Sequence, residues 1–344
     1  MTSAERSKLT NVNSYWTSRL TRDPALAVKN TTIGQHDLRS LLIFYAAPII
    51  INAVYDPDYA AAMLARYDDV VLGNDLANPS NPNYATTSTI ISKLAALAPN
   101  TVVWGYIDIG VNAPAYNHSL SSLQAQIDQW IAIGARGIFC DDYGYDFGVT
   151  RDRQNSVLDY IHGKGVGAMM NAWNIADALS PAIVATYNPS GTAAHADARD
   201  VYLLESWVFN SDAWPAPHYA TFWDLKTRGD DARTWRGSSG VRLYAANIMQ
   251  YSGTSTETLN AYRGMAEALA HIWRLDGLAV AMSNYVATGA DIGLVKPYKP
   301  LLGAMPGGRL MAPYTLNGAW TEVQAADLGL TVHFEPGNYG WTAS

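Results

Sequence analysis

Cysteine and charge are both scarce in this chain. Of its 344 residues only Cys140 is a cysteine, so no disulfide can form within the chain. Cys140 lies inside an apolar run, where we expect a small buried side chain rather than a nucleophile. Charged residues make up 15% of the sequence, the net charge is −7, and no run of lysine and arginine occurs. This disfavours nucleic acid as a partner, because phosphate binding needs basic patches.

Long apolar runs and metal-ligand spacings are also missing. No stretch approaches the roughly 18 apolar residues of a transmembrane helix, so we expect no membrane span. The N-terminal residues lack the apolar core of a signal peptide. The seven histidines are scattered without zinc-site spacing. Asp141, Asp142 and Asp146 could hold a divalent cation, but the calcium-loop pattern is absent. We therefore expect no metal and no cofactor.

Eight short apolar runs recur along the chain, each followed by a helical pattern. They begin 28 to 40 residues apart, which leaves room for about one helix in each interval. Most are apolar at every position, as expected for parallel strands buried on both faces. The runs begin at Leu41, Asp69, Thr101, Arg136, Gly165, Val201, Val241 and Gly277.

Helix signals occupy the intervals between these runs. Asp56 before Pro57 is typical of a helix start. Thr254 with Glu257 resembles a capping box. Eight strands with right-handed helical crossovers predict a closed (β/α)8 TIM barrel. An open, doubly wound α/β sheet is the alternative, but no glycine-rich phosphate turn follows the first run.

The barrel divides the chain into three parts. Residues 1–40 are an N-terminal extension, and residues 41–289 are the catalytic barrel. Residues 290–344 are a C-terminal extension in which prolines exclude one long helix and short strands are expected.

Acids and amides end the apolar runs from the second onward. The C-terminal ends of barrel strands face the active site. Asp141 directly follows GIFC and Glu205 directly follows VYLL. A carboxylate at such a buried place is costly unless it has a use or a partner, so we predict that these two are the catalytic pair. The other strand-end residues predicted to bind substrate are Asn74, Asp108, Asp142, Asn171 and Asn247.

Two of these assignments have open alternatives. A structural network explains Asp108 and Asp142 as well as a functional role does. Adjacent strand residues point to opposite faces, so only one of Asp141 and Asp142 can enter the barrel mouth without a bulge.

Two strand-end carboxylates suit glycoside hydrolysis. Asp141 would be the nucleophile or stabilising carboxylate, and Glu205 the acid/base. Aromatic rings can stack on sugar rings, and four of them flank the acids. The aromatic side chains predicted to bind sugar are Tyr106, Tyr143, Trp173 and Trp207. Together these features predict a glycosidase that needs no cofactor.

The stretches VVWGYIDIGVN and IDQWIAIGARGIFCDDYG resemble the spherulin-4-like and endo-α-1,4-polygalactosaminidase glycosidases. This resemblance implies a (β/α)8 barrel, an endo-acting and retaining reaction, and a polysaccharide substrate containing galactosamine. It also implies an acidic pair after strand four, matched by Asp141 and Asp142, and a strand-six glutamate, matched by Glu205. Asp142 departs from the family, which usually has glutamate there.

The N-terminal segment TSAERSKLTNV is similar to segments of phage tail fibres and tail spikes. This similarity implies a tail-associated polysaccharide depolymerase, located in the virion tail or outside the cell, with other tail proteins as partners. Otherwise we expect a cytoplasmic location, because no signal peptide is evident. A non-catalytic, glycan-binding barrel of a phage tail is the alternative, and a structural tail component with a decayed site is a third. Acids rather than amides at both strand ends favour the enzyme.

Overall fold

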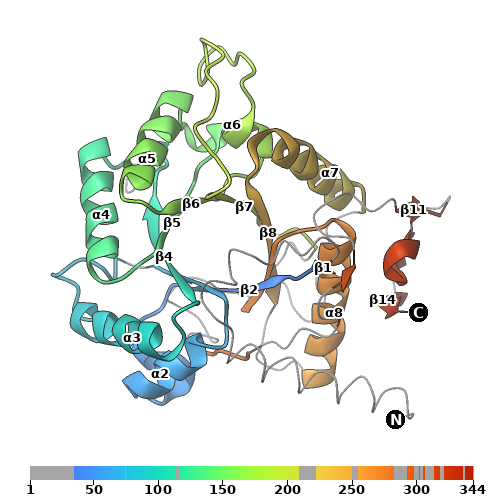
Figure 1. Cartoon of the computed structure of the whole chain (residues 1–344), viewed down its shortest axis with the longest axis horizontal. Coiled ribbons are helices and arrows are strands. Elements are labelled where there is room, and N and C mark those ends of the chain that lie inside the picture. The colour runs from blue at the N-terminus through green and yellow to red at the C-terminus, as the bar shows by residue number, and fades with distance from the viewer. Residues whose placement is uncertain are drawn as a thin grey trace.

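The structure is a computed structural model, and eight parallel strands, β2 to β9, close into a barrel in chain order (Figure 1). It describes residues 35–73, 75–112, 117–208, 222–249, 255–282, 293–297, 302, 305–306, 314–317, 321–335 and 338–343. Each strand pairs in parallel with the next, and β9 pairs with β2. The predicted TIM barrel is therefore confirmed.

The strands lie where the apolar runs occur, with starts within two residues of the predicted ones. They are β2 (Arg39–Phe44), β3 (Asp69–Leu72), β4 (Val102–Asp108), β5 (Gly137–Asp141), β6 (Gly167–Met170), β7 (Val201–Leu204), β8 (Arg242–Met249) and β9 (Gly277–Met282).

Helices cover the outside of the barrel between successive strands (Figure 1). They are α2 (Pro57–Leu64), α3 (Tyr84–Leu97), α4 (Leu120–Ala132), α5 (Arg151–Gly163), α6 (Ile175–Leu179), α7 (Phe222–Ser239) and α8 (Thr256–Ile272). Short 3-10 helices are η2 (Pro48–Ala53), η3 (Tyr145–Phe147) and η4 (Ala326–Leu328).

Side-chain caps fix several helix starts. Asp56 accepts a hydrogen bond from the Tyr59 amide at the start of α2, as its position before Pro57 predicts. At α8 the capping prediction is wrong by one residue, because Ser255 caps the helix by accepting from the Thr258 amide.

Two cores meet at the strands. The inner core fills the barrel with side chains such as Trp104, Phe139, Met169 and Leu203. The outer core lies between strands and helices and includes Ile107, Cys140 and Met170. Side chains thus alternate between the two cores along each strand, and this alternation decides which strand-end residues face the barrel axis.

Asp69 lies below the inner core, at the N-terminal end of the barrel strands. This fully buried carboxylate accepts hydrogen bonds from Arg39 Nε at 2.7 Å, Trp104 Nε1 at 2.9 Å and the Tyr244 hydroxyl at 2.9 Å. Asp69 begins β3, so the network lies at the N-terminal end of the strands. In TIM barrels that end contributes to stability rather than to the reaction.

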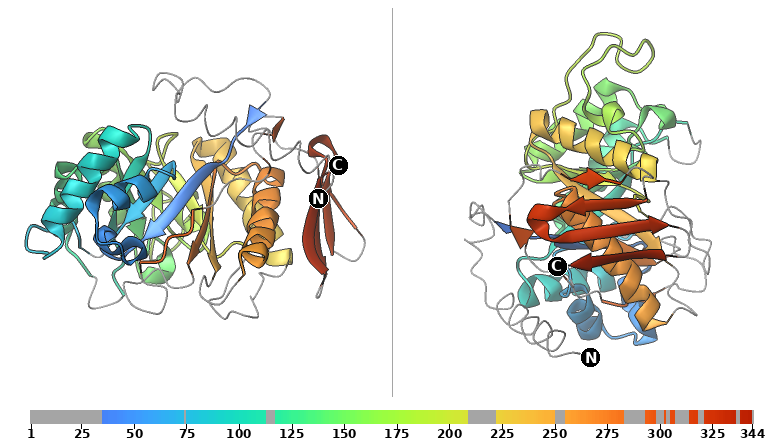
Figure 2. Two further views of the ribbon diagram at one scale, coloured as in Figure 1. Left: turned by 90° about the horizontal axis from the view of Figure 1, so that it is seen from below. Right: turned by 90° about the vertical axis from the view of Figure 1, so that its right-hand side faces the viewer.

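A second sheet covers part of the outside. Its four antiparallel strands are β11 (Thr315–Leu316), β12 (Glu322–Ala325), β13 (Leu330–Glu335) and β14 (Asn338–Ala343). The sheet packs across α8 (Figure 2). Near it, the Tyr314 hydroxyl donates to Asp230 of α7.

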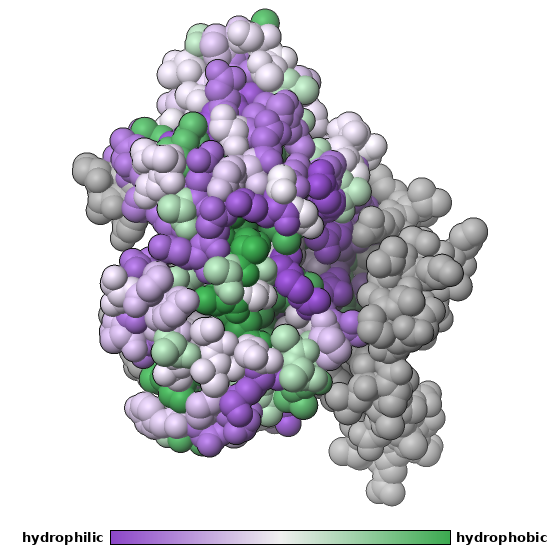
Figure 3. Space-filling model, turned by 60° about the vertical axis from the view of Figure 1, so that its left-hand side comes forward, coloured by the Kyte–Doolittle hydropathy of each residue, from purple (hydrophilic) through white to green (hydrophobic). Residues whose placement is uncertain are grey.

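Two short strands, β1 (Gln35–His36) and β10 (Met305–Pro306), pair with each other. Figure 3, in which the side bearing α4 comes forward, shows polar surface around a recessed apolar area. Among the described helices, none has the length and apolar character needed to cross a membrane. The segment similar to tail fibres lies outside the described residues.

Candidate functional site

The alternation of the strands directs four strand-end side chains toward the barrel axis. Trp104 and Phe139 belong to the inner core, so Asp108 and Asp141 have the same parity and face the same way. By the same argument Asn171, two residues after Met169, and Glu205, two residues after Leu203, also face the barrel axis. These four residues, with Asp142, define the barrel mouth at the C-terminal ends of β4 to β7.

Asn171 joins the two acids that the sequence predicts to be catalytic. Its Nδ2 donates to Asp141 Oδ1 at 2.8 Å and to Glu205 Oε2 at 2.9 Å. The other oxygen of Asp141 accepts from the Tyr106 hydroxyl at 2.9 Å. Asp141 is thus held by two side-chain donors, whereas Glu205 has one such bond, and its Oε1 accepts no hydrogen bond from the part of the chain that the structure describes.

Asp108 and Asp142 form a second carboxyl pair: their side chains meet beside Gly110, and each shifts the pKa of the other. Two neighbouring carboxyl groups disfavour the ionisation of both at once. Asp108 Oδ1 also accepts from the Gly110 amide at 2.8 Å. A Cβ on Gly110 would lie 3.0 Å from that oxygen and 3.0 Å from Cβ of Asp142, so glycine keeps this corner open.

Left-handed backbone explains how both adjacent aspartates reach the mouth. Asp142 has a φ of 51°, which ends the alternation of β5 and turns its carboxyl toward Asp108. Ser206, directly after Glu205, has a φ of 50°. A non-glycine residue in this region costs about 1–3 kcal/mol, and such strain gathers at functional sites. The expectation that only one aspartate can enter applies to a regular strand, and the left-handed Asp142, which follows the end of β5, lies outside it.

Burial and crowding raise the pKa values of the acids. Burial, reinforced by the charges of Asp141 and Asp108, raises the pKa of Asp142 to about 7. Burial raises the pKa of Asp141 as well, while the bonds from Asn171 and Tyr106 act against this. Burial also raises the pKa of Glu205. Near neutral pH Asp142 is therefore present in both its protonated and its ionised form.

Three predicted substrate-binding residues lie away from the mouth. Trp207 is fully buried, and its Nε1 donates to the Leu225 carbonyl at 3.1 Å. Tyr143 is fully buried in the outer core. Asn247 follows the inward-facing Ala246, so it points outward, where it is buried and accepts from the Val208 amide. These predictions are wrong because the face on which a strand-end side chain lies depends on the local backbone. Tyr143 and Trp207 each follow a residue with positive φ, and Asn247 lies on the outward face of β8. Asn74 lies outside the described residues.

Trp173 and Tyr106 do lie near the acids. Trp173 is 55% exposed just beyond β6. Tyr106 stacks on Phe139 with ring centres 5.8 Å apart, so its ring is packed and its hydroxyl is the part that serves the mouth.

Arg228 is a residue of the site that sequence reasoning missed. It projects from α7, and its guanidinium lies 4.2 Å from the centre of the Trp173 ring. Its Nη2 donates to the Glu205 carbonyl at 2.7 Å. Strand-end patterns cannot identify a residue in the interior of a helix, so no signal in the sequence indicated it.

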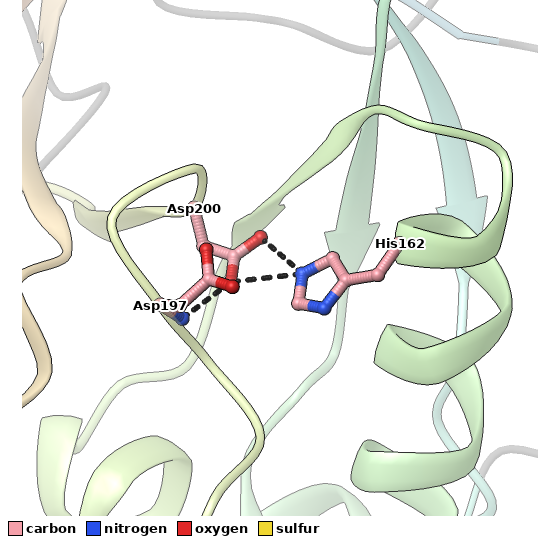
Figure 4. A group of neighbouring side chains, drawn as sticks. All are labelled: His162, Asp197 and Asp200. Atoms are coloured by element: carbon pink, nitrogen blue, oxygen red, sulfur yellow. Dashed lines mark hydrogen bonds and ion pairs between the residues drawn. The ribbon is translucent and has the colours of Figure 1, made fainter.

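The described part of the chain contains one group of side chains whose spacing suits a metal ion: His162, Asp197 and Asp200 (Figure 4). His162 is near the C-terminus of α5 and Asp200 directly precedes β7, so the group lies at the N-terminal end of the strands. The oxygens of Asp200 already accept bonds from His162 and from the Ala168 and Asp197 amides. These hydrogen bonds give the group a structural role, because Asp200 connects α5 with the starts of β6 and β7, away from the mouth.

Comparisons with known proteins find distant structural matches. No family model and no curated protein matches the chain. An aldolase from Escherichia coli K12 is 13% identical, with a TM-score of 0.38 over 72% of this chain and 76% of that one. The ribulose-1,5-bisphosphate carboxylase/oxygenase from Pyrococcus horikoshii OT3 is 12% identical, with a TM-score of 0.40 over 78% and 55%. The carboxyl transferase domain of Rhizobium etli pyruvate carboxylase is 10% identical, with a TM-score of 0.41 over 72% and 40%.

The prediction of glycoside hydrolysis is corrected here. In the structure, Tyr143 and Trp207 are core residues, and Tyr106 is packed on Phe139, so the expected row of sugar-stacking rings is not formed. The polysaccharide depolymerase and its glycan-binding alternative are therefore both set aside. The resemblance to the spherulin-4-like family stays a prediction.

Proposed function

We propose that this chain is an enzyme that transfers protons on a small carbonyl compound by general acid–base catalysis at the barrel mouth. The observation that carries the proposal is the pair of carboxyl systems there. Asn171 holds Asp141 and Glu205 together, and beside them Asp108 and Asp142 form a crowded pair in which the pKa of Asp142 is raised to about 7. A base and an acid thus lie at one strand-end layer.

Glu205 is the base in this proposal. Its Oε1 accepts no hydrogen bond from the described residues, and burial raises its pKa, which makes the carboxylate a stronger proton acceptor. Asp141 is a positioning residue, because its oxygens accept from Asn171 and Tyr106 and so fix the amide that orients Glu205.

Asp142 is the acid. With a pKa of about 7 it is protonated in about half of the molecules at neutral pH, and this protonated form can donate a hydrogen bond to an oxygen that gains negative charge. Removal of a proton from a carbon next to a carbonyl needs this combination. Glu205 takes the proton, the C–H electron pair forms a C=C double bond, and the π pair of the C=O bond moves to the oxygen. This oxygen accepts the proton of Asp142, which gives an enol and leaves Asp142 as a carboxylate.

Hydrogen–deuterium exchange tests this proposal. Pyruvate, dihydroxyacetone phosphate and dihydroxyacetone are incubated with the protein in D₂O, and loss of the C–H signals is followed by NMR. The wild type should accelerate exchange of at least one probe. Glu205→Gln should lower the rate by about 100-fold or more, because one general base contributes roughly that factor. Glu257→Gln, an exposed change on α8, is the matched control and should exchange like the wild type. If the wild type and the Glu205→Gln variant give equal exchange with all three probes, the proposal is wrong.

A further inference from the structure

Arg228 makes fewer hydrogen bonds than Arg151 and Arg153, two other arginines near the mouth. Arg151 donates to the carbonyls of Asp177, Ala178 and Ser180. Arg153 donates to the carbonyls of Ile109 and His118. Both guanidinium groups are therefore committed to holding loops.

Arg228 has one hydrogen bond within the described residues, from Nη2 to the Glu205 carbonyl. Its Nε is buried and has no partner there. Glu205 and Asp224 act on it through space, and it forms no ion pair with a described carboxylate. Burial lowers its pKa, yet an arginine keeps its charge at any ordinary pH. A guanidinium has five N–H donors, so most of this charged group is unused.

The surroundings hold this group in place. The indole of Trp173 covers one face of the guanidinium, a contact that orients it and leaves its edge available. The loop bearing Trp173 is fixed by the buried Tyr202 hydroxyl, which donates to the Ala172 carbonyl at 2.6 Å. The bond to the Glu205 carbonyl places the cation beside the proposed base. An immobilised arginine that has no ion pair with a described residue, at a site otherwise dominated by acids, is suited to bind an anion.

We propose that Arg228, stacked on Trp173, binds an oxyanion of the substrate, either a carboxylate or a phosphate group. The inference rests on the proposed function, because it names the substrate class of the same site: a carbonyl compound with an anionic group. The planar guanidinium matches the oxygen spacing of both groups and can bind either through two parallel hydrogen bonds. Binding there holds the carbonyl end toward Glu205 and Asp142, and it excludes neutral ketones by affinity.

The first experiment measures binding without turnover. Calorimetric titration of the Glu205→Gln variant with pyruvate and with inorganic phosphate separates the two oxyanion sources. Adding Arg228→Gln should weaken binding of the preferred anion by about 10- to 100-fold, the usual effect of a charged hydrogen bond. Adding Arg199→Gln, at the exposed N-terminal end of β7, is the matched control and should leave binding unchanged. Equal affinity with and without Arg228→Gln would overturn the inference.

A second variant guards against misfolding. Arg228→Lys keeps the charge but loses the planar fork, so it should bind more tightly than Arg228→Gln and more weakly than Arg228. Circular dichroism and a thermal melt establish that each variant is folded. Full binding by Arg228→Lys together with loss in Arg228→Gln still supports a cation-dependent site, whereas full binding by both contradicts it.

The hydrogen–deuterium exchange assay then separates a failure of the anion site from a failure of the proposed acid–base function. If pyruvate or dihydroxyacetone phosphate exchanges at least about tenfold faster than dihydroxyacetone, and Arg228→Gln removes that preference, both proposals stand. Binding through Arg228 with no exchange of any probe contradicts the acid–base function but supports the anion site. Exchange that is equally fast for the neutral probe contradicts the anion site alone.

Discussion

At the scale of single residues, Asp142 combines a strained backbone conformation with a raised pKa. Its left-handed backbone brings a second carboxyl beside Asp108, and its pKa rises to about 7 through burial and the charges of Asp141 and Asp108. Asparagine tolerates the same backbone conformation, so Asp142→Asn removes the titration without adding backbone strain. This position therefore separates the chemistry of the site from its geometry.

Asp142→Asn should make the protein more stable than the wild type at pH 8. In the unfolded chain the aspartate has a pKa near 3.8, whereas the folded state raises it to about 7. Between these values the folded state binds more protons, so the stability of the wild type falls as the pH rises. Thermal melts at pH 5 and pH 8 should give a Tm gain for the variant that grows with pH. A gain that is the same at both pH values would contradict this prediction.

At the scale of elements, the antiparallel sheet on α8 has a structural role in this account. Leu330 of β13 is 1% exposed and, with Val332, belongs to the outer core. Leu330→Ala should lower the free energy of unfolding by about 2–4 kcal/mol in urea titrations, because it leaves a cavity. Leu97→Ala, at a position that is 58% exposed, should cost much less. Similar losses for both would show that β13 is not part of the core.

Elements were also what the sequence predicted best. Each of the eight apolar runs became a strand, because parallel strands buried on both faces leave a continuous apolar signal. The direction of a strand-end side chain was harder to predict. Trp207 follows Glu205 by two residues and would share its inward direction in a regular strand, but Ser206 with its positive φ lies between them, and Trp207 is buried outside the barrel.

The candidate site was partly predictable from the positions at which the apolar runs end. Asp108, Asp141, Asn171 and Glu205 end their runs at the inward parity, and the structure brings them together. Arg228 was not predictable, because it reaches the mouth from α7 and owes its place to contacts with Trp173 and the Glu205 carbonyl. Tertiary contacts of that kind leave no periodic signal in the sequence.

At the scale of the whole molecule, the two ends of the barrel have different duties. Asp69 closes the N-terminal end with bonds from Arg39, Trp104 and Tyr244. The His162–Asp200 tie lies at the same end. The strained and crowded carboxyl groups lie at the other end. Stability and catalysis should therefore respond to different substitutions.

Asp69→Asn should destabilise the fold and leave the mouth intact. An amide cannot accept from all three donors, and the Arg39 charge would lose its partner, so we expect a loss of about 2–4 kcal/mol in the free energy of unfolding. Asp58→Asn breaks an ion pair with Lys93 in which Asp58 is 76% exposed, so its cost should be below about 1 kcal/mol. Exchange activity per folded molecule should be unchanged by either. Loss of activity in folded Asp69→Asn would contradict this division of duties.

The most direct test of the account is a carbon-13 NMR titration of the aspartate carboxyl groups between pH 4 and pH 9. The account predicts one carboxyl that titrates near pH 7 and is missing from the spectrum of Asp142→Asn. It also predicts that this titration is altered by Asp108→Asn, because each of the two carboxyls shifts the pKa of the other. If every aspartate of the folded wild type is fully ionised by about pH 5, as ordinary carboxyls are, the pKa of Asp142 is not raised and the acid–base mechanism at the barrel mouth is contradicted.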